Sequence, residues 1–170
     1  MPGALLFALQ VSITGVVAAL AARWYLVPWL ARQPFARGIE PLLLLHATRV
    51  VGLSFLARAV RGEPIPFGHA ALAAGGDTAT ALLALASLGL VRHRHRGARV
   101  AVALTNVVGL TDIIVVAIWG VFIDFPELPL GATWFIPTEL GPVMVVTHVA
   151  MFWFLWHTRG EVVASPVTER

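Results

Sequence analysis

The sequence predicts an all-α integral membrane protein, a bundle of five transmembrane helices formed by residues 1–170 as a single domain. Apolar residues make up 58% of the chain and charged residues only 12%, whereas an ordinary soluble domain carries about 25% charged residues. So few charges do not cover the surface of a soluble globule of this size. Five segments also reach the roughly 20 apolar residues that a spanning helix needs. The expected surroundings of the chain are therefore a lipid bilayer.

The expected helices are separated by short polar connections and run over about residues 5–29, 41–60, 69–91, 100–123 and 139–157. Pro41 would stand in the first turn of the second helix, where a missing N–H costs nothing. The fifth helix should begin irregularly over residues 134–140, because Pro137 and Pro142 interrupt its start. The first segment lacks a positively charged region before its apolar run, which favours a retained helix over a cleaved signal peptide.

Arginine supplies all of the basic side chains that are not histidine, and its distribution predicts the orientation. Two arginines, Arg58 and Arg61, lie at the end of the second helix and just after it, and Arg49 lies near its middle. The other nine lie in the connections after the first and third helices and in the tail: Arg23, Arg32, Arg37, Arg92, Arg94, Arg96, Arg99, Arg159 and Arg170. Because positive charge is retained on the cytoplasmic side, the N-terminus should lie outside and the C-terminus inside a bacterial cytoplasmic (inner) membrane. The basic run over residues 92–96 indicates a hairpin that faces anionic lipid, and we expect no nucleic-acid partner.

Several kinds of chemistry are excluded or unsupported by the sequence. The chain contains no cysteine, which excludes disulfides, thiolate metal sites, covalently attached haem and cysteine nucleophiles. It has no nucleophile elbow, HExxH zinc motif or phosphate-binding loop, so no reaction type is indicated. We expect no metal site. The tryptophans fall at or near the ends of the expected helices, which is typical of anchors at the membrane interface.

Polar residues within the spans are the main functional signal. A charged residue at the centre of a spanning helix costs about 2.5–3.5 kcal/mol, so such residues normally face inward and have partners. Arg49, Asp77, Asp112 and His148 fall near the middle of four different spans, and we expect an Arg49–Asp77 pair or an arginine that bridges both aspartates. The complete candidate site adds His46, Asn106 and, where the chain re-enters from the outer side, Glu139.

Helical phase refines this expectation. Small residues at three- and four-residue spacing around Asp77 predict a face that packs closely against neighbouring helices: Ala70, Ala73, Ala74, Thr80, Ala81 and Ala84. Asn106 lies about 120° from Asp112 around its helix, which assigns it to a different contact. Glu139 would begin a path from outside to the centre. One arginine against two aspartates leaves excess negative charge, which a proton, a protonated His46 or His148, or a bound cation would balance.

These residues favour a small membrane protein whose buried polar site binds or moves a small ion, proton or solute. A b-type haem protein that exchanges electrons with quinone is an alternative, with His46 and His148 as axial ligands. A lipid- or isoprenoid-modifying enzyme is another, with Asp77, Asp112 or Glu139 as acid or base. The remaining alternative is an accessory subunit or scaffold with a purely structural polar cluster. A homo-oligomer or a larger membrane complex is compatible with each.

Two local patterns resemble known families. Residues 23–29, Arg-Trp-Tyr-Leu-Val-Pro-Trp, resemble a stretch of the tryptophan-rich sensory protein/translocator family, which also has five spans. Because the likeness is confined to that stretch, it implies no ligand. A wider likeness is to small bacterial multi-span proteins of no assigned function. It is carried by residues 49–53, Pro66-Phe67 with Gly76-Asp77, residues 106–110 with Asp112, and Ile136-Pro137-Thr138 with Pro142 and His148. This likeness implies one shared site and no activity.

Overall fold

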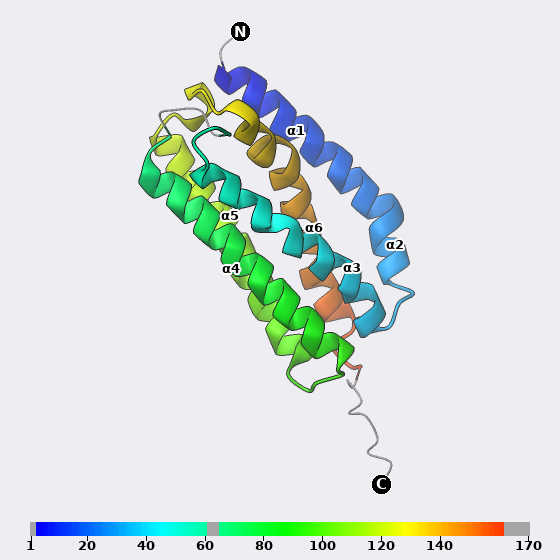
Figure 1. The fold of residues 1–170 in the computed structure, drawn as a ribbon. Helices are drawn as coiled ribbons and strands as arrows, with labels where there is room; N and C mark the ends of the chain where they lie inside the picture. Colours follow the sequence, from blue (N-terminus) through cyan, green and yellow to red (C-terminus); the bar gives the residue numbers. More distant parts are fainter. Residues whose placement is uncertain (1–2, 61–64, 162–170) are drawn as a thin grey trace.

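The computed structural model describes residues 3–60 and 65–161, and the regular secondary structure of this part of the chain is helical throughout. Within it, five helices are long and apolar enough to cross a membrane, and Figure 1 shows them side by side as one elongated bundle. They run over Gly3–Leu30, Phe35–Leu56, Phe67–Arg92, Ala98–Phe122 and Gly131–His157. The all-helical prediction is therefore confirmed. Arg61 and Arg170, which were counted for the orientation, lie outside the described residues.

The first and last spans each contain one widened helical turn shortly before a proline. The first span consists of α1 (Gly3–Ala21), the π-helical turn η1 (Ala22–Leu26) and α2 (Val27–Leu30). The last span consists of the 3₁₀ turn η4 (Gly131–Trp134), the π-helical turn η5 (Ile136–Leu140) and α6 (Gly141–His157). Pro28 and Pro142 follow the two π turns. A proline ring crowds the carbonyl one turn earlier, and a wider turn relieves this clash. The expected irregular start of the fifth helix is present.

The second span differs from its expected limits. It begins at Phe35 rather than near Pro41, and it ends at Leu56 rather than near residue 60. Pro34 has extended backbone (φ −65°, ψ 153°) and stands immediately before the helix. It therefore starts the helix, while Pro41 lies inside it. Pro34 and Pro41 could each mark the start of this helix, and the start expected near Pro41 is wrong.

The second half of this span is a 3₁₀ helix, which positions the candidate site. After α3 (Phe35–Ala47), the nine residues of η2 (Thr48–Leu56) form 3₁₀ turns. A 3₁₀ helix has three residues per turn, so residues three apart lie on one face, and runs longer than four residues are uncommon. The buried residues of η2 are Arg49, Gly52 and Phe55, which share this face. Because the helix is of the 3₁₀ type from Thr48 on, one residue in each of three consecutive turns faces the interior of the bundle.

The remaining helices enclose η2. α4 (Phe67–Arg92) and α5 (Ala98–Phe122) are antiparallel and are joined by a tight hairpin at residues 93–97, in which Arg94 has a φ of 51°. α4 packs against α3, η2 and α5, while α6 packs against α5, α3 and α1. The small-residue face predicted for α4 is buried. We call the end of the bundle at residues 93–97 the hairpin end, and the opposite end, which holds Gly3 and residues 123–135, the N-terminal end.

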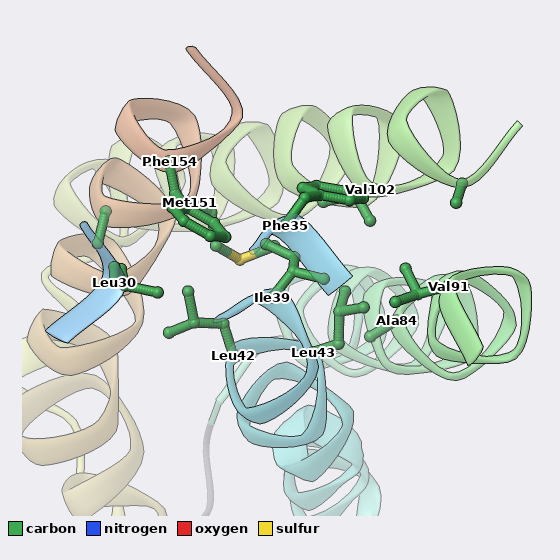
Figure 2. Packing of buried hydrophobic residues seen from close by; sticks show 12 residues of the cluster. Leu30, Phe35, Ile39, Leu42, Leu43, Ala84, Val91, Val102, Met151 and Phe154 are labelled. Carbon is green, nitrogen blue, oxygen red and sulfur yellow. The ribbon is translucent and has the colours of Figure 1, made fainter. Parts of the chain in front are cut away.

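The hairpin half of the bundle is filled by apolar side chains. We call this group the hairpin-end cluster, and it consists of Leu30, Phe35, Ile39, Leu42, Leu43, Ala84, Val91, Ala98, Val102, Ala150, Met151 and Phe154. Figure 2 shows side chains from α3, α4, α5 and α6 converging on its centre. Gly38 allows the ring of Phe154 to lie directly against the α3 backbone, where a Cβ atom would overlap it. The space between α3, α4, α5 and α6 at this end is therefore filled, while a separate hollow lies between the first span and α6, lined by residues such as Ala18, Trp29 and Val143.

α1 lies at the edge of the bundle and is attached through one polar face. The N–H groups of Gly3 and Ala4 donate hydrogen bonds to Glu127 of the 3₁₀ turn η3 (Phe125–Glu127). Trp134 Nε1 donates to Gln10 Oε1 at 2.6 Å, and the Thr14 hydroxyl donates to Glu139 at 3.1 Å. Residues 3, 10 and 14 share one side of a helix with 3.6 residues per turn. These bonds hold α1 against the N-terminal end.

Candidate functional site

Arg49 is the centre of the candidate site and joins three helices. Its side chain is 3% exposed. Nε donates to Asp77 Oδ1 of α4 at 2.6 Å, and Nη2 donates to Asp112 Oδ2 of α5 at 2.5 Å. The second of the two arrangements expected from the sequence, an arginine that bridges both aspartates, is the one present. The planar guanidinium offers donors along two edges, which is why one arginine serves two carboxylates.

The remaining nitrogen of the guanidinium, Nη1, faces α5 and α6. Nη1 donates to the carbonyl of Gly109 at 2.9 Å and contacts Nε2 of His148 at 3.2 Å. Arginine has no acceptor, so Nε2 of this histidine must be the accepting nitrogen. The proton of the imidazole then lies on Nδ1, which donates to Asn106 Oδ1 at 2.6 Å. These hydrogen bonds therefore indicate that the imidazole of His148 is neutral.

Asn106 belongs to this network, which corrects the separate contact assigned from its helical phase. Its Nδ2 donates to the carbonyl of His148 at 3.1 Å while its Oδ1 accepts from the ring. Asn106 and Asp112 do point in different directions from α5. However, Asn106 reaches α6 and Asp112 reaches η2, and His148 and Arg49 connect the two. A phase argument within one helix does not reveal a link that passes through two others.

His46 lies next to His148 and does not contact the carboxylates. The two ring centroids are 4.0 Å apart, and both side chains are fully buried. His46 Nε2 lies 3.3 Å from the Thr147 hydroxyl, and its Nδ1 has no hydrogen-bond partner. The two histidines therefore form a closely packed pair with an angle of 31° between the ring planes, and His148 connects this pair to Arg49.

The packing of this histidine pair does not fit the haem alternative. Axial imidazoles bind iron from opposite faces of the porphyrin, but the rings of His46 and His148 lie against each other with no room for a macrocycle between them. Both ring nitrogens of His148 are also engaged by Arg49 and Asn106. In addition, no group of three or more His, Cys, Asp or Glu side chains within residues 3–60 and 65–161 is placed to hold a metal ion.

Glu139 is the one candidate residue that the structure separates from the others. Its carboxylate accepts the hydrogen bond from Thr14 on α1. Glu139 does not line the apolar cavity of the bundle that reaches the cluster of Arg49, Asp77 and Asp112. Glu139 therefore helps to attach α1, and the expected path through it is not present. Asp124, at the end of α5, is the acidic residue that lies at the outer part of that cavity.

Three glycines make the close approach of the charged side chains possible. Gly52, Gly76 and Gly109 lie on η2, α4 and α5. A Cβ atom on Gly52 would overlap the carboxylate of Asp77, and one on Gly76 would overlap that of Asp112. A Cβ atom on Gly109 would lie 2.8 Å from Arg49 Nη1 and 2.6 Å from a ring carbon of His148. Each member of the cluster thus occupies space that a glycine leaves open.

Two of these glycines, which were not predicted as part of the site, stand in a seven-residue pattern that occurs twice in the sequence. Residues 48–54, Thr-Arg-Val-Val-Gly-Leu-Ser, and residues 105–111, Thr-Asn-Val-Val-Gly-Leu-Thr, differ only at their second and last positions. The second position holds Arg49 in one and Asn106 in the other, and the fifth holds Gly52 and Gly109. A polar residue three positions before a glycine therefore recurs at the centre of the bundle.

A large apolar cavity reaches the cluster from the N-terminal end. Its volume is about 760 Å³, and α1, η2, α4, α5, η5 and α6 contribute its walls. On α1 it extends from Ala4 to Gly15, which corresponds to about 16 Å along a helix. Apolar side chains such as Phe7, Phe55 and Val116 dominate the walls. This volume is within the range of small-molecule sites.

The charged groups form the inner limit of this cavity. Arg49, Asp77 and Asp112 line it, and the two aspartate side chains are 14% and 10% exposed.

Residues 6–156 match the model of a protein family described as a domain of unknown function (DUF8737). The chain belongs to this family. The DUF8737 domain contains the whole cluster and nearly all of the cavity lining. No curated protein and no solved structure matches the chain.

Proposed function

We propose that this protein is an integral membrane protein that binds a small, predominantly apolar solute in the cavity, with a polar group of the solute against the Arg49–Asp77–Asp112 cluster. The observation that carries the proposal is the composition of the cavity: its walls are predominantly apolar, and charged side chains gather at its inner part. Small-molecule sites usually combine apolar walls with a few well-placed polar groups. Charged side chains inside a membrane are expensive, and their usual justification is functional.

The outer surface of the bundle supports insertion into a bilayer. Large apolar side chains cover it, including Ile13, Leu82 and Phe122, which are 62%, 63% and 80% exposed. An exposed apolar surface of this extent requires lipid around it. Most of the described arginines lie at the hairpin end, which supports an orientation with this end on the cytoplasmic side of a bacterial inner membrane. The cavity then opens toward the outer side.

The filled interior of the hairpin half favours binding over open conduction. A solute or ion that moved past Arg49 toward the cytoplasm would meet the hairpin-end cluster, whose members are buried and tightly packed. Packed cores of this kind do not deform continuously. The arrangement therefore supports a binding site reached from one side, and any transfer across the membrane would require a second arrangement of the helices.

Binding is tested by photolabelling in lipid nanodiscs with a neutral alkyl diazirine alcohol, followed by mass spectrometry of the labelled residues. We expect labels on cavity-lining residues of α1, α5 and α6. Val11 lines the cavity and Ile13 does not, so Val11→Trp should abolish this labelling and the matched Ile13→Trp should leave it unchanged. Labelling that is spread over the lipid-facing surface and is indifferent to Val11→Trp would contradict the proposal.

The orientation has a separate test, because the chain has no natural cysteine. A membrane-impermeant maleimide should label Leu128→Cys, at the N-terminal end, in intact cells. It should label His95→Cys, in the hairpin, only after lysis. The opposite pattern would reverse the orientation.

A further inference from the structure

The hydrogen bonds and charges around Arg49 also indicate which class of solute the site takes. We infer that the ligand is a lipophilic monovalent cation, with its positive charge against the carboxylates of Asp77 and Asp112 and its apolar body in the cavity. This inference rests on the proposed function, because it requires that the cavity binds a solute.

The charge balance of the site carries the first step. Two carboxylates face one guanidinium, and His148 is neutral because it accepts from Arg49. With both aspartates ionised, the cluster carries one negative charge in excess. A buried charge without a counter-charge is strongly unfavourable in a low-dielectric region. One proton or one monovalent cation restores neutrality, whereas an anion would increase the imbalance.

The free hydrogen-bonding groups carry the second step. A guanidinium has five N–H donors, and Arg49 uses four of them on Asp77, Asp112, Gly109 and His148. Each aspartate uses only one oxygen, and among the described residues the second oxygens have no hydrogen-bond partner, although neither is fully buried. Both aspartates line the cavity, and their second oxygens lie on the sides that face Gly52 and Gly76. The site therefore has two free acceptor oxygens against one free N–H of Arg49. Such a site suits a positively charged or N–H-bearing group.

The rest of the cavity is consistent with a cation. Among the described residues that line the cavity, Asp124, near its outer part, is the one further charged residue, and none is a lysine or a second arginine. The three aspartates outnumber Arg49 in this described lining, and a cleft of net negative charge attracts cations. The aromatic rings of Phe7, Phe55 and Phe125 also line the walls, and they provide contacts for an apolar body and attractive faces for a cation.

Cation and proton then compete for the same oxygens. The titratable and charged groups that face the cluster are Arg49 from η2, His46 from α3, Asp77 and more distantly His69 from α4, Asp112 from α5 and His148 from α6. α1 contributes Ala4, Phe7, Val11 and Gly15 to the cavity, which carry no side-chain charge. A protonated cluster is already neutral, so cation binding at low pH must release a proton.

The test compares two probes of nearly equal shape and opposite charge, tetraphenylphosphonium and tetraphenylborate. Binding is measured by equilibrium dialysis with the protein in nanodiscs of zwitterionic lipid. We expect saturable binding of the phosphonium at least tenfold tighter than that of the borate. Asp112→Asn leaves a neutral Arg49–Asp77 pair and should weaken phosphonium binding at least tenfold. The matched control Glu139→Gln removes a carboxylate outside the cavity and should change nothing.

The pH dependence provides a second readout that requires no variant. Phosphonium affinity should fall as the pH falls, by about tenfold per unit once the carboxylate pair holds its proton. Equal binding of both probes, or an Asp112→Asn variant that is folded and binds normally, would overturn the inference. If the neutral photolabel still occupies the cavity in that case, the proposed function survives without the charge preference. If neither the photolabel nor either ion binds, the proposed function fails as well.

Discussion

Replacing Gly76 by alanine should break one specific contact, the ion pair between Arg49 and Asp112. A Cβ atom at this position would overlap the Asp112 carboxylate, so the carboxylate has to leave its place beside Nη2 of Arg49. Gly75 is the matched control, because it is the preceding residue of the same helix and a Cβ atom there would meet nothing within 4 Å. The two variants therefore add the same methyl group and differ in what it touches.

The expected difference follows from two contributions. Glycine to alanine inside a helix stabilises by about 1 kcal/mol, and both variants gain this. Gly76→Ala additionally loses a charge-assisted hydrogen bond, which is worth roughly 1.5–3 kcal/mol. Its free energy of unfolding should thus be lower than that of Gly75→Ala by about 2 kcal/mol, which is about thirtyfold in the unfolding equilibrium.

The assay is equilibrium unfolding in mixed micelles, in which the fraction of sodium dodecyl sulfate is raised and the fluorescence of the six tryptophans is followed. The same pair of substitutions is then made in an Asp112→Ala background, where no carboxylate remains to be displaced. There the two variants should unfold at the same detergent fraction. A difference that persists without Asp112, or no difference in its presence, would refute the assignment of Gly76 to this contact.

Two further predictions concern the same network and the hairpin-end cluster. Arg49→Ala should lower the free energy of unfolding by about 3–5 kcal/mol, because it leaves two carboxylates without a counter-charge. Asp112→Ala should lower it much less, because a neutral Arg49–Asp77 pair remains. Equal losses of stability in the micelle titration would contradict this charge balance. Phe154→Ala should cost roughly 2 kcal/mol, less than in a soluble core because lipid also solvates the unfolded side chain, so that mainly the cavity contribution remains. The control Phe152→Ala removes a ring that is 38% exposed, and its transition should stay within about 0.5 kcal/mol of the parent protein.

The sequence analysis predicted the partners of Arg49 because an isolated charge inside a membrane is too costly to leave unpaired. Depth along each helix could be counted from the sequence, and it placed both aspartates within reach. The contacts of Asn106 and His46 with His148, and of Glu139 with Thr14, were not predicted. For these residues the decisive quantity is how each helix is rotated and how close it lies to its neighbours, which hydropathy and periodicity do not report.

The limits of the second span show a similar division. Hydropathy located the span, but Pro34 and Pro41 gave competing start signals. The 3₁₀ geometry of residues 48–56 had no predicted counterpart, although the buried residues Arg49, Gly52 and Phe55 are spaced by three. Apolar residues on both faces of the span conceal this period, because lipid-facing positions are as apolar as buried ones.

Three properties could be derived from the amino-acid sequence: the chain is helical, five of its segments are apolar enough to span a bilayer, and its few internal charges must meet. These properties follow from composition and from the cost of burying a charge, which do not depend on the arrangement of the helices. The packing of the helices was needed to show which atoms meet, that Gly76 and Gly109 leave room for them, and that an apolar cavity ends at the carboxylates. Those features depend on distances between helices, which arise when all of the helices pack together.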